Sequence, residues 1–153
     1  MPVTHATFTV ERSYAKPPAA VFRAFADPAL KREWFAEGEG FTVESFAMDF
    51  RVGGVETGRF RMTDTTPFPG APVANDTVYT DIVPNERIIL AYSMSINGAR
   101  MSCSQATFLF TAEGTGTRLT MIEQGCFFEN GDGPAGRERG WNALADALGR
   151  HLM

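Results

Sequence analysis

The sequence is poor in the residues from which metal sites and disulfide frameworks are built. Its two histidines, His5 and His151, lie near opposite ends of the chain, without the spacing of a metal site. We interpret His5 as part of a frayed end and His151 as a residue of the last helical turn that interacts with the helix C-terminus. Two cysteines, Cys103 and Cys126, are too few for a disulfide framework, and neither lies in a nucleophile signature. The sequence therefore predicts no metal site, no cofactor and reduced thiols.

Long apolar runs and basic clusters are also absent. No apolar stretch approaches the ~20 residues of a membrane-spanning helix, and residues 1–14 alternate polar and apolar side chains, unlike a signal peptide. The net charge is −4, and Lys and Arg form no cluster of the kind that nucleic-acid binding requires. No glycine-rich loop joins a strand to a helix in the manner of a nucleotide site. We therefore expect a cytoplasmic protein that binds neither nucleic acid nor a membrane.

The composition fits one domain over residues 1–153. A domain of this length buries roughly 70% of the surface of its unfolded chain, and 44% of its residues are hydrophobic. Phenylalanine is abundant, with 13 Phe against 3 Tyr and 2 Trp. Because phenylalanine offers a large apolar area and no polar group, this bias suits either a thick core or the lining of an apolar cavity.

Hydrophobic periodicity predicts an α+β domain. A first strand over residues 7–14 is followed by Pro17-Pro18, which start a helix, and by Asp27-Pro28, which end it and cap a second short helix. Further strands are predicted over residues 41–52, 55–62, 77–83, 87–96, 100–111 and 117–126, and a helix over 134–152. Since no single register turns every apolar residue of 41–62 inward, we expect a bulge there.

The last helix presents one apolar stripe of Trp141, Leu144, Leu148 and Leu152. Short turns between consecutive strands favour an antiparallel meander. One amphipathic helix covers only part of such a sheet, and the two short helices complete the packing on the same face. A space between the helix and the sheet is therefore expected.

Several segments together resemble a known family. They are PAAVFRAF (18–25), DFRVGG (49–54), DIVP (81–84) with ERI (86–88), GTRLT (116–120), EQG (123–125), and RE with GW (137–141). From about Phe8 to Leu152 the chain resembles the Hsp90-ATPase-activator-homologue-like family of the START superfamily, which also contains polyketide cyclases. The resemblance implies a helix-grip fold, in which a seven-stranded antiparallel sheet holds a long C-terminal helix with a cavity between them. The eukaryotic co-chaperones of this family carry an additional N-terminal domain, and the sequence resembles only their C-terminal domain.

Glu123 is the polar residue of greatest interest. Strand alternation puts it on the same face as Leu119 and Met121, toward the helix, where a carboxylate must be paired or hydrogen-bonded. In the implied fold the first strand neighbours the last, which predicts a structural pair between Arg12 and Glu123. A ligand-orienting pair at the cavity mouth and a general acid/base role are the alternatives.

The cavity is expected between the C-terminal helix and the sheet, bordered by Trp141, Leu144, Leu148, Tyr92 and Phe108. The full set of ligand-binding candidates is Trp34, Phe35, Tyr92, Met94, Phe108, Phe110, Met121, Glu123, Trp141, Leu144 and Leu148. Packing in a solid core is the alternative for each apolar member of this set.

The predicted register between the strands over 100–111 and 117–126 determines where the two cysteines lie. If Gly114-Thr115 forms a two-residue loop, Phe110 lies opposite Leu119, Phe108 opposite Met121, and Cys103 opposite Cys126 on the outer face. A bulge near Gln105 or Gly125 would shift this register, and a two-residue loop at Asn97-Gly98 would turn Cys103 inward.

From these observations we expect a non-enzymatic protein that binds a hydrophobic small molecule. A polyketide-cyclase-like enzyme, with Glu123 or Tyr92 as the polar participant, is the first alternative. An Hsp90-related interaction protein is the second.

Overall fold

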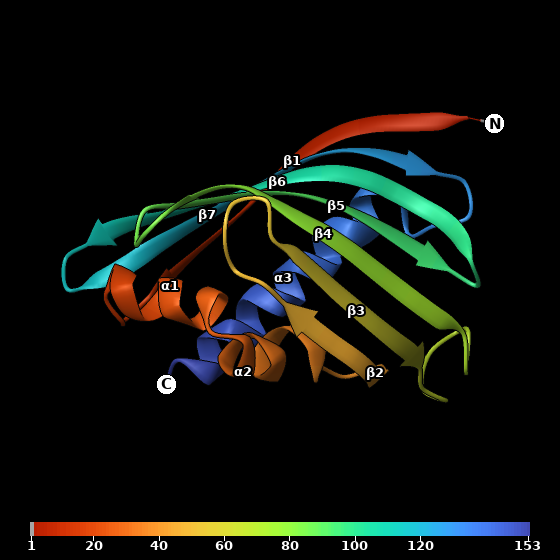
Figure 1. The fold of residues 1–153 in the computed structure, drawn as a ribbon, viewed down its shortest axis with the longest axis horizontal. Helices are drawn as coiled ribbons and strands as arrows, with labels where there is room; N and C mark the ends of the chain where they lie inside the picture. Colours follow the sequence, from red (N-terminus) through yellow and green to blue (C-terminus); the bar gives the residue numbers. More distant parts are fainter. Residues whose placement is uncertain (1) are drawn as a thin grey trace.

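The computed structural model describes residues 2–153. Seven strands form one antiparallel sheet in the order β1-β7-β6-β5-β4-β3-β2. The strands are β1 (Val3–Tyr14), β2 (Phe41–Met48), β3 (Val55–Met62), β4 (Pro72–Val83), β5 (Arg87–Ile96), β6 (Ala99–Glu113) and β7 (Gly116–Phe128). The helices are α1 (Pro18–Ala26), α2 (Pro28–Lys31), the short π-helical η1 (Arg32–Ala36) and α3 (Gly133–His151). Figure 1 shows the helices on one face of the curved sheet, with α3 running beneath the strands. The α+β helix-grip prediction is confirmed.

The two short helices begin where the sequence predicts. Asp27 caps α2, because its side chain accepts a hydrogen bond from the backbone N–H of Ala29 at 3.0 Å. Trp34 in η1 is 3% exposed and donates its indole N–H to the carbonyl of Ala24 in α1 at 2.9 Å. This bond fixes η1 against α1, so the short helices pack together on one face of the sheet.

Three predicted strand boundaries are wrong. β1 begins at Val3 and not at residue 7, because β7 continues to Phe128 and pairs with these residues. His5, predicted on a frayed end, is therefore a strand residue opposite Cys126. β4 begins at Pro72 and not at residue 77; proline is tolerated there because it opens the strand, and its carbonyl accepts the backbone N–H of Asn97 at 2.9 Å. β2 ends at Met48, before the turn at Gly53, whose φ is +83°. The predicted bulge in this hairpin is present, since the register shifts between Val43 and Ser45.

The predicted register at the β6–β7 hairpin is confirmed. Phe108 lies opposite Met121, Phe110 opposite Leu119 and Cys103 opposite Cys126. The two-residue turn at Asn97-Gly98 is also present, yet Cys103 faces outward. A register shift beyond Met94 leaves Met101 as an extra residue in β6, and this bulge restores the outward direction of Cys103.

Most of the phenylalanine side chains lie in the core. Phe25 packs against Trp34, Phe108 and Phe110 with ring centroids 4.9, 5.1 and 5.3 Å apart. Phe22 packs edge-on against Phe110 at 5.4 Å. The aromatic bias therefore builds a dense interior between the helices and the β6–β7 half of the sheet.

Candidate functional site

Glu123 is fully buried on the inner face of β7, with 0% of its surface exposed. Its carboxylate accepts hydrogen bonds from the sheet: the Tyr92 hydroxyl donates to Oε1 at 2.6 Å, and the Ser104 hydroxyl donates to Oε2 at 2.8 Å. Burial raises the pKa of Glu123, while the Tyr92 bond and the charge of Arg137 oppose the rise. The inward direction of Glu123 and its polar partnering agree with the sequence prediction.

Two side chains of α3 complete the surroundings of Glu123. Trp141 donates its indole N–H to Oε1 at 2.9 Å, and Arg137 places Nη1 3.4 Å from Oε2. Arg137 also donates to the Tyr92 hydroxyl at 2.9 Å and to the Ser102 hydroxyl at 2.8 Å. We call these residues the Glu123 cluster: Tyr92, Ser102, Ser104, Glu123, Arg137 and Trp141. The cluster joins the first half of α3 to β5, β6 and β7.

The predicted pair between Arg12 and Glu123 is wrong. Arg12 instead bonds to α3, with Nε 3.0 Å from Asp146 Oδ1 and Nη2 donating to Asn142 Oδ1 at 2.8 Å. The reason is register: β1 pairs Phe8, and not Arg12, with Glu123. Four residues of strand separate the two positions, which is roughly 13 Å. Arg12 therefore joins β1 to the second half of α3.

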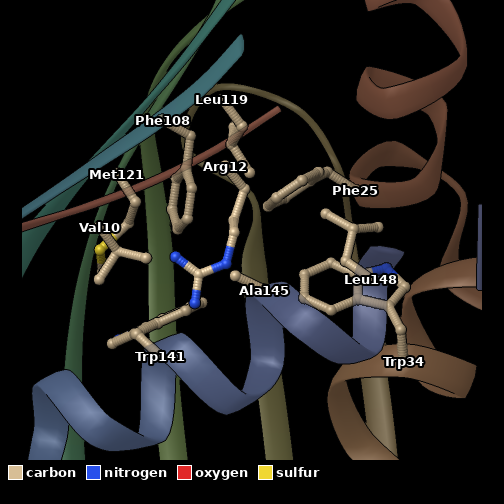
Figure 2. A pocket seen from close by; sticks show the side chains of 10 residues that line it. All are labelled: Val10, Arg12, Phe25, Trp34, Phe108, Leu119, Met121, Trp141, Ala145 and Leu148. Carbon is tan, nitrogen blue, oxygen red and sulfur yellow. The ribbon is translucent and has the colours of Figure 1, made fainter. Parts of the chain in front are cut away.

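A small hollow lies between α3 and the sheet, with a volume of about 10 Å³ (Figure 2). The residues that line it are Val10, Arg12, Phe25, Trp34, Phe108, Leu119, Met121, Trp141, Ala145 and Leu148. The hollow has room for about one water molecule. The ligand-sized cavity expected at this position is therefore not open in this structure, because aromatic side chains fill the space.

The ligand-binding candidates divide into two groups. Trp34, Phe108, Met121, Trp141 and Leu148 line the hollow. The other members are placed elsewhere: Tyr92 and Glu123 in the polar cluster, and Phe35, Met94, Phe110 and Leu144 in the surrounding core. Trp141 belongs to both regions, since it lines the hollow and bonds to Glu123.

A second buried charged group was missed. Lys31 Nζ lies 2.7 Å from Glu56 Oε1, and the side chains of this pair are 5% and 3% exposed. The Tyr79 hydroxyl donates to the same oxygen at 2.5 Å, and burial raises the pKa of Tyr79. The alternation of β3 contains a signal for this site, because Phe60 faces inward and Glu56 has the same parity.

Two features are absent from residues 2–153. No helix in this range has the length and apolarity to cross a membrane. In the same range, no three or more His, Cys, Asp and Glu side chains are grouped so that they could hold a metal ion.

Comparison with known proteins gives consistent matches. The family model for "Activator of Hsp90 ATPase homolog 1-like protein" matches residues 15–153. The crystal structure of Mll3558 from Rhizobium loti is 44% identical, with 99% of each chain covered and a TM-score of 0.87. A putative uncharacterized protein from Rhizobium leguminosarum is 39% identical over 99% of this chain and 96% of that chain, with a TM-score of 0.89. A search of curated proteins found no match.

More distant structures share the fold alone. The AHSA1-like protein from Aeromonas hydrophila is 18% identical, with 96% of this chain and 92% of that chain covered and a TM-score of 0.68.

Proposed function

Since the chain belongs to the family of Activator of Hsp90 ATPase homolog 1-like proteins, we propose that it binds a small hydrophobic molecule between α3 and the sheet. The observation that carries the proposal is the hollow beneath α3, whose lining is apolar except for Arg12, which Figure 2 shows among the apolar side chains. An apolar lining with few polar groups is typical of small-molecule sites. A hollow of about 10 Å³ is closed to a ligand, so binding requires α3 to move away from the sheet.

The way in which α3 is held supports such a movement. Of its 19 residues, only Arg137, Ala145 and Leu148 are buried. Trp141 and Leu144 pack partly buried against the core. Polar contacts add further attachments, among them the Tyr14 hydroxyl, which donates to the carbonyl of Ala145 at 2.7 Å. Exposing one Leu side chain costs about 1.5–3 kcal/mol, which an apolar ligand can offset by its own burial.

Turnover in the same interior is less well supported than binding. Glu123 and Tyr92, the acid/base candidates, do not line the hollow. Their polar atoms already bond to each other and to Arg137 and Trp141. A general acid or base must reach the proton that it transfers. The geometry therefore favours a structural role for this pair.

An interaction with Hsp90, which the family's description mentions, would use the surface. The apolar pair Val55 and Val78 lies opposite across β3 and β4, 50% and 43% exposed. Two side chains supply far less area than the roughly 1,200 Å² of a specific interface. We therefore retain small-molecule binding as the proposed function.

Native mass spectrometry of the protein purified from its own host tests the proposal. We expect a non-covalent adduct that dissociates at raised collision energy. Ala145→Phe, whose ring is larger than the hollow and occupies the space beneath α3, should lose the adduct, whereas Ala143→Phe on the exposed side of α3 should keep it. An adduct of equal abundance in both variants, or no adduct in the unmodified protein, would overturn the proposal.

A further inference from the structure

The outer face of the sheet carries a row of three reactive side chains. His5 on β1 lies opposite Cys126 on β7, and Cys126 lies opposite Cys103 on β6. Cys103 is exposed and Cys126 is half-buried. Cys103 and Cys126 point away from α3, because their strand neighbours Ser102, Ser104 and Phe127 are buried on the inner side. His5 shares their face, since it lies directly opposite Cys126. This row is separate from the hollow and the Glu123 cluster.

The register brings the two thiols within bridging range. Directly opposed residues of an antiparallel pair have Cα atoms about 4.5–5.5 Å apart. Disulfides span Cα separations of about 4.4–6.8 Å. Cys103 and Cys126 therefore meet the distance requirement for a disulfide without any shift of β6 against β7.

Cys126 has a neighbour that can accept its proton. Its Sγ lies 3.5 Å from Nδ1 of His5. In the tautomer that carries its proton on Nε2, Nδ1 can accept a hydrogen bond from the thiol and take up its proton as the sulfur attacks. An open depression of about 670 Å³, lined in part by His5, Cys103 and Cys126, gives a small solute access to both sulfur atoms.

We propose that Cys103 and Cys126 form a modification site at which a hydroperoxide produces a reversible intramolecular disulfide. The Cys126 thiolate attacks the peroxide, so that an S–O bond forms, the O–O bond breaks and an alcohol or water leaves with the proton. The Cys103 thiol then attacks Sγ of the sulfenic acid; the S–S bond forms and water leaves. Two thiols and one hydroperoxide give one disulfide, one alcohol and one water. A thiol reductant reverses the reaction.

The cross-link joins strands that are already paired, so it leaves the inner face unchanged. We expect it to raise the thermal unfolding temperature, because it restricts the unfolded chain. Ligand binding beneath α3 should be the same in the oxidised and reduced forms. The site is therefore independent of the proposed function.

Stoichiometric hydrogen peroxide, applied to the reduced full-length protein, tests the site. We expect the intact mass to fall by about 2 Da, for loss of two hydrogens. The count of free thiols should fall from two to none, and peptide mapping should find Cys103 linked to Cys126. Dithiothreitol should restore both thiols. Persistence of both free thiols, sulfinic acid without a disulfide, or disulfides only between molecules would overturn the proposal.

Two variants test the roles of the register and of His5. In C103S/Q105C the new thiol lies diagonal to Cys126, about 7–8 Å away, which is too far to bridge. This variant should form at least tenfold less intramolecular disulfide than the unmodified protein. His5→Ala should slow the oxidation severalfold and leave its end product unchanged. Equal cross-linking in the diagonal variant would refute the register argument, and an unchanged rate in His5→Ala would refute the role of His5.

Discussion

Trp141 on α3 donates its indole N–H to Glu123 Oε1 on β7 at 2.9 Å, while its ring lines the hollow beneath the helix. One side chain thus connects the buried polar cluster with the apolar space. If a molecule enters the hollow as proposed, we expect it to displace the Trp141 ring and to change the bond to Glu123. The Glu123 cluster therefore holds α3 against the sheet.

Glu123→Gln should destabilise the protein by about 1–3 kcal/mol, because the amide nitrogen would face groups that donate hydrogen bonds. Urea unfolding at neutral pH measures the change. Glu86→Gln, at an exposed turn position, is the matched control and should stay within about 0.5 kcal/mol. A Glu123→Gln protein as stable as the control would show that the cluster does not hold α3.

Double-mutant cycles should show that Glu123 is energetically coupled to Arg137 and not to Arg12. Arg137 and Glu123 are in contact, so their cycle should give a coupling energy of about 0.5–3 kcal/mol. Arg12 and Glu123 do not touch, and their cycle should give a coupling within about 0.5 kcal/mol of zero. The pair of Arg12 and Asp146, with side chains 30% and 57% exposed, should contribute no more than about 1 kcal/mol. A strong coupling of Arg12 to Glu123 would contradict the observed β1–β7 register.

Arg137→Met should destabilise the protein in a pH-dependent manner. Burial already raises the pKa of Glu123, and removing its cationic partner raises that pKa further. Because the folded pKa lies above the unfolded value, the stability of the variant should decrease as pH rises from the ordinary carboxyl range toward neutrality. Urea unfolding from pH 4 to pH 7 checks the sign. A cost that is constant or larger at pH 4 would contradict it.

Lys31→Met should cost about 3–5 kcal/mol, since it leaves the Glu56 carboxylate buried without its cation. Lys16→Met, at an exposed position, offers the same chemical change without burial and should have little effect. Thermal and urea unfolding of the two variants measure the difference in their stability. Equal stability would mean that the Lys31–Glu56 pair is hydrated in solution.

A strand register can be predicted from the sequence where a short turn fixes it. A two-residue loop joins β6 to β7, and its pairing could be counted as far as Cys103 and Cys126. No hairpin joins β1 to β7, because three short helices and five other strands lie between them in the chain. The sequence therefore did not determine how far along the strands Arg12 lies from Glu123. Arg12 was predicted as the partner of Glu123 in place of Arg137.

The sequence also left open whether the interior of the domain is solid or encloses a cavity. Strand and helix periodicity predicts which side chains face inward, and Trp34, Phe108 and Trp141 do so. Whether such rings enclose a void depends on how they interlock in three dimensions. Pairs such as Phe108 and Trp141, with ring centroids 5.5 Å apart, close the space that the family resemblance led us to expect.

The indole N–H signals in ¹H–¹⁵N NMR spectra report directly on whether an apolar molecule enters beneath α3. The protein has two tryptophans, Trp34 and Trp141, and both line the hollow. During titration with 1-anilinonaphthalene-8-sulfonate, we expect saturable shifts of both signals, larger for Trp141 because its bond to Glu123 is disturbed, and no shifts in Ala145→Phe. Saturable binding of the probe with both indole signals unmoved would contradict entry beneath α3.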